Sequence, residues 1–297
     1  MLYCFLGLLV LWLLVMAGVL CFSYSATSSG EKLPLNGSQA PKVEASARPR
    51  SWMSSNQPPQ SLRTIDREIK KGFVRKVYSI LATQLLITAG IAVGMIYASF
   101  YHGDPNYLTK FGNGFIYNSS LSFLLFILTI ILLCFLFSLK NSYPANYLLL
   151  LAFTASISFT VARVCVIYYS AGSGTQILLA FAITAATFLA LTTFTMISRV
   201  DWDFMGPFLF AGMFLLMFWS LIMSLVFAFG GGFSSGWSLA FAIVGTILFS
   251  GFIIYDTNNI MRYCGVDDYI IAAIELYLDV LNLFLFILQI LTLSNNN

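Results

Sequence analysis

The chain has 297 residues, of which 59% are hydrophobic and only 9% are charged. A soluble domain carries about 25% charged residues, so this composition excludes an ordinary water-soluble fold and places most of the chain in lipid. The net charge is only +3, and no nucleic-acid-binding motif accompanies the basic residues, so no nucleic acid is expected as a partner.

The first apolar segment covers residues 1–23 and is long enough to span a bilayer. No basic residue precedes it, as one would in a secretory signal, although small residues follow it where cleavage could occur. The choice lies between an N-terminal membrane anchor and a cleaved signal. Because the next segment is strongly basic, the charge rule for membrane topology favours the anchor.

Residues 24–62 are rich in Ser, Pro, Asn and Gln, a composition typical of a disordered linker. Ten of the 15 Lys and Arg residues fall between Lys32 and Lys76. A basic stretch beside a membrane usually marks its cytoplasmic face. We therefore expect the linker to be cytoplasmic.

Residues 63–297 contain seven apolar segments, each long enough for a tilted membrane-spanning helix. They predict an all-α membrane domain with spans near residues 77–101, 116–139, 147–169, 176–198, 204–229, 237–255 and 269–293, the sixth extending to about 260. The connections after the second, fourth and sixth spans carry Lys140, Arg199 and Arg262. This alternation predicts that these loops are cytoplasmic and that the C-terminus lies outside or in a lumen.

Two aspartates lie in the last two apolar segments. Asp256 ends the sixth and Asp279 lies in the middle of the seventh. A carboxylate at membrane depth is costly, so it normally faces a bundle interior or a water-filled path and is a functional candidate. Glu275, Asp279 and Asn282 follow at helical spacing and form one polar face, which predicts that the last helix lies inside the bundle.

If Asp256 and Asp279 approach each other, they are expected to titrate as one coupled pair. Their hard oxygen ligands suit Ca²⁺, so the same two residues are the candidate metal ligands. Lys140 is a candidate counter-charge, or alternatively an ordinary lysine at a cytoplasmic helix end. The simpler interpretation of Asp279 and Glu275 is structural, with both carboxyl groups hydrogen-bonded to neighbouring helices.

Other polar features give weaker signals. Arg163 lies inside the third span, where it could extend toward the interface or pair with a carboxylate. The five cysteines show no paired spacing and there is one histidine, so neither a disulfide framework nor a zinc site is predicted. Gly90 and Gly94 form a GxxxG pattern that predicts close helix packing in lipid.

Three segments, GTILFSGFIIYDTNNI, LYLDVLNLFL and KKGFVRKVYSIL, resemble the transmembrane Bax-inhibitor-motif family, in particular its lifeguard branch. The resemblance covers about residues 69–293. It implies six helices around a central seventh, a location in the endoplasmic reticulum or Golgi membrane, and a pH-sensitive Ca²⁺ leak channel that suppresses cell death. It implies no enzyme activity and no cofactor other than Ca²⁺, with cell-death regulatory membrane proteins as further partners.

The resemblance also assigns roles to residues. The aspartates matching Asp256 and Asp279 form the proton-sensing pair of the family, and in bacterial relatives an arginine near the position of Lys140 bridges that pair. A lysine has one point-like head in place of a planar fork, which weakens the analogy. Because Met53 begins a segment that looks like an ordinary start for the family, residues 1–52 could be an added exon, an alternative start or a gene-model extension instead of an anchor.

Three competing functions need comparison. Intramembrane aspartyl proteases also carry YD in one span and Asp in the next, but they need GxGD around the second aspartate, where this chain has LYLD. An adaptor that regulates cell death without conducting ions is a second alternative. A proton-coupled carrier is a third, and saturation of its transport would distinguish it from a leak.

Overall fold

The computed structural model describes residues 60–101, 104–105, 107–139, 142–198, 200–232, 234–262 and 269–295. The predicted N-terminal anchor, nearly all of the predicted linker and Lys140 lie outside the described residues. Within them the elements are helices. Their bounds are α2 (Gln60–Ser99), α3 (Lys110–Tyr117), α4 (Ser119–Ser138), α5 (Ala145–Ser170), α6 (Gly174–Ile197), η3 (Asp203–Met205), α7 (Gly206–Ala228), α8 (Ser235–Arg262) and α9 (Tyr269–Asn295).

Seven of the described helices are long and apolar enough to cross a membrane. They are α2, α4, α5, α6, α7, α8 and α9, so the predicted all-α fold with seven spans is confirmed. The sixth span is longer than its apolar run suggests, because α8 continues from Tyr255 through Asp256 to Arg262. Asp256 therefore lies inside a helix and not at its end.

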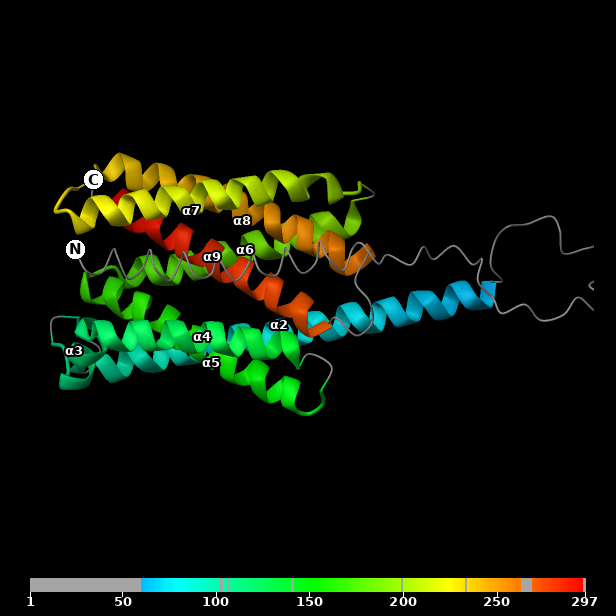
Figure 1. Ribbon diagram of the computed structural model, residues 1–297, viewed down its shortest axis with the longest axis horizontal. Coiled ribbons are helices and arrows are strands. Elements are labelled where there is room, and N and C mark those ends of the chain that lie inside the picture. Colours follow the sequence, from blue (N-terminus) through cyan, green and yellow to red (C-terminus); the bar gives the residue numbers. More distant parts are fainter. Residues whose placement is uncertain are drawn as a thin grey trace, which may run out of the picture.

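The helices form two groups with α9 between them (Figure 1). One group contains α2, α4 and α5 with the short α3 at one end, and the other contains α7 and α8. Helix α6 packs mainly against α8 and α9 and so belongs with the second group. The chain crosses from one group to the other between α5 and α6, and α9 then returns between them.

The last helix is the centre of the bundle, as predicted. In its most apolar 18-residue window, 94% of the residues are buried, whereas the figure for α4 is 17%. A helix that is apolar on every side is stable only when other helices surround it or lipid does. In α9 the surrounding groups are protein, whereas α4 contacts mainly α5 and leaves most of its surface outward.

One close approach fixes α8 against α9. A Cβ atom placed on Gly245 of α8 would overlap the Phe286 ring. Phe286 is fully buried and packs against the rings of Phe241 and Phe249. The prediction of close helix packing at Gly90 and Gly94 of α2 is wrong within the described residues, because nothing lies within 4 Å of a Cβ atom placed on either glycine.

The predicted second span is confirmed as α4, but it begins a few residues later than predicted and a short helix precedes it. Residues 110–117 form the separate helix α3, which begins after Thr109, whose hydroxyl accepts a hydrogen bond from the Gly112 amide. Asn118 ends α3 and caps α4, since its side-chain oxygen accepts hydrogen bonds from the amides of Ser120 and Leu121. Both caps use residue types favoured at helix starts, so the break has a local cause in the sequence.

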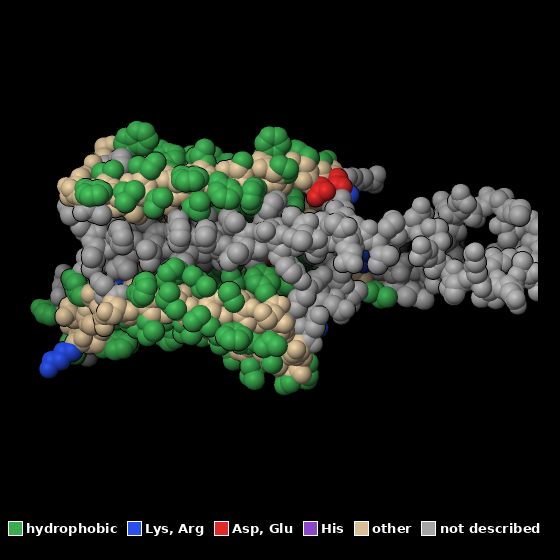
Figure 2. All heavy atoms as spheres, viewed as in Figure 1, with side chains coloured by type: hydrophobic (Ala, Val, Ile, Leu, Met, Phe, Trp, Pro, Cys, Tyr) green, Lys and Arg blue, Asp and Glu red, His purple; other side chains and the backbone are tan. Residues whose placement is uncertain are grey.

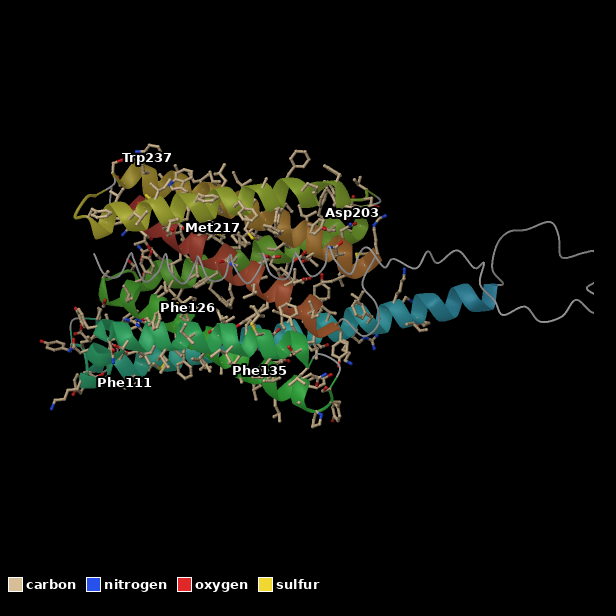
Figure 3. The ribbon with its side chains drawn as sticks, viewed as in Figure 1. Phe111, Phe126, Phe135, Asp203, Met217 and Trp237 are labelled. Atoms are coloured by element: carbon tan, nitrogen blue, oxygen red, sulfur yellow. The ribbon has the colours of Figure 1, made fainter. Side chains whose placement is uncertain are left out.

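The outer surface along both helix groups is mostly hydrophobic, and the visible charged side chains lie toward the ends of the bundle (Figure 2). Figure 3 shows Asp203 at one end and Trp237 at the other, with Met217 on α7 and Phe126 and Phe135 on α4 between the ends. This distribution matches what a bilayer requires, because the charged groups avoid its hydrocarbon core.

Candidate functional site

The two intramembrane aspartates meet inside the bundle. Asp256 of α8 is 9% exposed and Asp279 of α9 is 6% exposed. Their carboxyl groups lie close enough to each other to interact electrostatically and to share a hydrogen bond. The sequence placed them on consecutive helices, and the antiparallel packing of α8 on α9 brings them together.

This contact has a chemical consequence. Two ionised carboxylates repel each other and neither carries a hydrogen to donate, so a hydrogen bond between them requires at least one proton. Two carboxyl groups that share a proton titrate as a pair, and a change in one alters the other. The arrangement can therefore hold a proton at the centre of the bundle, and loss of that proton leaves an additional negative charge there.

The predicted polar face of α9 is only partly buried. Asn282 is fully buried, whereas Glu275 is half-buried nearer the start of the helix. The Asn282 side-chain nitrogen donates to the Leu278 carbonyl oxygen at 2.9 Å. Asn282 Oδ1 and Asp279 Oδ2 are buried and have no hydrogen-bond partner among the described residues. The two residues are three positions apart on one helix, so both lie on neighbouring parts of the same face.

Other ionisable groups act on the pair from three directions. Glu275 of α9 lies close enough to Asp279 to interact electrostatically with it. Tyr78 of α2 and Tyr255 of α8 both feel the charge of Asp256. Groups that can titrate or hydrogen-bond therefore reach the pair from α2, α8 and α9.

The end of α8 beyond Asp256 is held in place by Asp201, in the connection between α6 and η3. Asn258 donates to Asp201 Oδ1 at 3.2 Å, and Arg262 Nη1 lies 3.6 Å from Asp201 Oδ2. Arg262 also donates from Nη2 to the Val200 carbonyl oxygen at 3.0 Å. These contacts fix the last turn of α8, so they also fix the position of Asp256 relative to the end of the bundle.

A second polar cluster, which the sequence reasoning missed, lies on another side of α9. The Tyr277 hydroxyl is 2.8 Å from Thr88 Oγ1 of α2, which is 2.9 Å from Ser158 Oγ of α5. Because Tyr277 precedes Asp279 by two residues, it lies roughly opposite the aspartate on the helix. The sequence signal for this cluster was a tyrosine hydroxyl two residues before Asp279 in a strongly apolar span, where such a group needs a hydrogen-bond partner. These bonds attach α9 to the first group of helices.

Arg163 does not extend to the interface, contrary to one of the two expectations. Its side chain is 4% exposed, and its Nη2 donates to the Ile116 carbonyl oxygen at 2.7 Å. Ile116 lies in the last turn of α3, where a positive charge is favourable because the helix dipole ends there in free carbonyls. Among the described residues the partner of Arg163 is thus a helix end and not a carboxylate, and the bond attaches α3 to α5.

The metal prediction stays a prediction. Within the part of the chain that the structure describes, no group of three or more His, Cys, Asp or Glu side chains could hold a metal ion. Ca²⁺ usually takes six to eight oxygen ligands, and the pair offers two carboxyl groups together with the free Asn282 oxygen. These ligands are too few for a complete protein cage around Ca²⁺. They suit a passing cation that keeps part of its hydration shell.

Comparison with known proteins identifies the family. The family described as "Inhibitor of apoptosis-promoting Bax1" matches residues 70–297 of this chain. The chain belongs to the Bax-inhibitor family. The resemblance inferred from the sequence motifs is thereby confirmed. The matched residues include both aspartates, most of α2 and every helix from α3 to α9.

Individual members of the Bax-inhibitor family match over most of the chain. Protein lifeguard 4 of Mus musculus is 37% identical over 231 residues, which is 76% of this chain and 87% of that protein. Protein LIFEGUARD 2 of Arabidopsis thaliana is 35% identical over 227 residues, 75% of this chain and 88% of that protein. The Golgi anti-apoptotic protein of Vaccinia virus (strain Lister) is 34% identical over 242 residues, 79% of this chain and 91% of that protein. This Bax-inhibitor-family chain is a multi-pass integral membrane protein.

Proposed function

We propose that this protein is a pH-sensitive Ca²⁺ leak channel of an intracellular membrane, in which Asp256 and Asp279 form the proton sensor. The hydrogen-bonded carboxyl pair at the centre of a seven-helix bundle carries the proposal. Burying a carboxylate at membrane depth costs about 2.5–3.5 kcal/mol on insertion scales, so two of them in contact need a compensating role.

The polar face of α9 supports a path for cations through the site. Asp279 Oδ2 and Asn282 Oδ1 are buried acceptors without a partner among the described residues, and both belong to the central helix. Oxygen acceptors of this kind replace part of the hydration shell of a Ca²⁺ ion. Glu275, half-buried and nearer the start of α9, supplies a third carboxyl group along the same face.

The direction of the pH effect follows from the strength of the contact. A hydrogen bond from a carboxylic acid to a carboxylate is charge-assisted and about twice as strong as one between neutral groups. The pair is therefore held most tightly when it carries one proton. A second proton, taken up as the pH falls, removes the charge and weakens the link between α8 and α9. We expect the leak to increase as the pH falls.

The cellular setting is part of the same proposal. A viral relative is named a Golgi anti-apoptotic protein, and the family name concerns inhibition of apoptosis. We infer that this chain suppresses cell death from the Golgi or endoplasmic reticulum membrane. Lys70, Lys71 and Arg75 in the first half of α2 are exposed, and Arg262 is the last residue of α8. The start of α2 and the end of α8 lie toward the same end of the bundle (Figure 1), which supports a cytoplasmic assignment for that end.

Purified protein in liposomes tests the proposal. The full chain is reconstituted into vesicles that contain a Ca²⁺-sensitive dye, and Ca²⁺ entry is measured across a range of pH. We expect entry above that of protein-free vesicles, increasing toward acidic pH and without saturation. Saturating entry with counterflow would indicate a carrier. No entry at any pH, with protein correctly folded in the vesicles, would contradict the leak and favour the adaptor.

A further inference from the structure

Tyr78 carries a hydrogen bond directly from one helix group to the other, without passing through α9. Its hydroxyl on α2 donates to Thr257 Oγ1 on α8 over 3.4 Å. In Figure 1 α2 lies with α4 and α5, whereas α8 lies with α7 on the other side of α9. The contact therefore lies at the seam between the two groups.

A third helix contributes to this seam. The ring of Tyr78 packs against Phe188 of α6, with ring centroids 6.5 Å apart. Thr192, one turn further along α6, lies beside the Tyr78 hydroxyl, and its own buried hydroxyl has no hydrogen-bond partner among the described residues. Hydroxyl groups from α2, α6 and α8 therefore lie near one another at this seam.

The seam contact is next to the carboxylate pair. Thr257 follows Asp256 directly in α8, and the charge of Asp256 acts on Tyr78. Lys76, two residues before Tyr78, has its Nζ 3.2 Å from the ring centre of Tyr269, the first residue of α9. Thr257 is one residue nearer than Asp256 to the C-terminal end of α8, where Arg262 is.

These positions give Tyr78 a defined place in the path. It contacts α8 at Thr257, between Asp256 and the end of the helix that carries Arg262. We propose that Tyr78 is a gating residue, whose bond to Thr257 closes the seam on the basic side of Asp256 and Asp279. The inference rests on the proposed leak and adds a second constriction to it.

The geometry of the bond fits a contact that opens and closes. Oxygen–oxygen hydrogen bonds in proteins are usually about 2.7–2.8 Å long, so a separation of 3.4 Å marks a weak one. By contrast, the bonds that attach Tyr277 to Thr88 and Thr88 to Ser158 are 2.8 and 2.9 Å long. The weak bond lies at the seam, and the strong ones lie where α9 joins the first group.

Removal of one hydroxyl tests the gate. Tyr78→Phe keeps the ring and its contact with Phe188 but removes the donor, and Thr257→Val removes the acceptor. Tyr277→Phe is the matched control, since it also removes one buried tyrosine hydroxyl. Access is measured by the rate at which a small, membrane-impermeant thiol reagent, applied from the basic side, labels Asn282→Cys in a chain whose five native cysteines are changed to alanine.

We expect Tyr78→Phe and Thr257→Val each to increase labelling several-fold, with no further increase in the double variant because both remove one bond. Ca²⁺ entry into liposomes should rise in parallel. Faster labelling without Ca²⁺ entry in any variant would support the role of Tyr78 as a gate and contradict the proposed Ca²⁺ leak. Unchanged labelling in Tyr78→Phe, or an equal increase in Tyr277→Phe, would overturn the gate even if the wild-type protein conducts Ca²⁺.

Discussion

The substitution Gly245→Ala tests the packing that holds the central helix. The added methyl group would overlap three ring atoms of Phe286. Phe286 is fully buried, with Phe241 and Phe249 at ring-centre distances of 5.5 and 5.7 Å, so a shift of the ring would disturb its neighbours. Either the ring or α8 must move.

The expected cost follows from two opposing effects. Overpacking a well-filled core by one methyl group typically costs about 1–3 kcal/mol. Alanine favours a helix over glycine by about 1 kcal/mol, which offsets part of that loss. The net destabilisation of Gly245→Ala should therefore be at most about 2 kcal/mol relative to the wild type, and about 1–3 kcal/mol relative to a variant that gains the same helix propensity without overpacking. For a chain of this size, the second difference corresponds to roughly 2–12 °C in the unfolding midpoint.

Thermal unfolding of detergent-solubilised protein measures the effect, and Gly90→Ala is the matched control. Nothing lies within 4 Å of a Cβ atom on Gly90, so this variant gains the helix propensity without overpacking and should be as stable as the wild type or slightly more stable. Phe286→Leu removes the ring edge and should recover part of the loss in Gly245→Ala. Equal midpoints for Gly245→Ala and Gly90→Ala would refute the close approach of α8 and α9.

Two further predictions concern the ends of the bundle. Arg163→Met removes the donor to the Ile116 carbonyl, so amide hydrogen exchange in α3 should become faster while exchange in α9 stays slow; Arg163→Lys, with one compact head, should give an intermediate result. Unchanged exchange in α3 would contradict the role of Arg163 as its attachment. A reporter fused after Asn297 should resist protease added to the cytoplasmic side of sealed vesicles, and its digestion would reverse the topology inferred from the basic residues.

Much of the architecture is encoded in local sequence. Seven apolar segments of sufficient length predict seven spans, and the helix of each extends over the predicted residues. The central place of α9 follows from Asp279 and Asn282, because polar groups at membrane depth must face protein or water. The meeting of Asp256 with Asp279 could be expected from their presence in consecutive antiparallel spans, but their contact depends on the rotation of α8 and α9, which packing decides.

Features that depend on tertiary contacts were not predictable in the same way. The break between α3 and α4 has a local signal in Asn118, yet the apolar run continues across it and hides the cap. The bond of Tyr277 to Thr88 joins residues 189 positions apart, and hydropathy alone says nothing about such a pair. Arg163 donates to the Ile116 carbonyl oxygen at the end of α3, and this partner could not be predicted because the sequence did not predict α3 as a separate helix.

The central claim is that Asp256 and Asp279 act as one titrating unit that controls Ca²⁺ passage. Its most direct test is the pH dependence of Ca²⁺ entry into liposomes that contain the wild type, Asp256→Asn, Asp279→Asn or the double variant at equal protein level. Each single change keeps the side-chain volume and removes the proton site, so it should flatten the pH response, and the double variant should add little because the two groups are coupled. Single effects that sum would indicate independent sites, and a wild-type pH response in the double variant would contradict the sensor and leave the aspartates with a structural role.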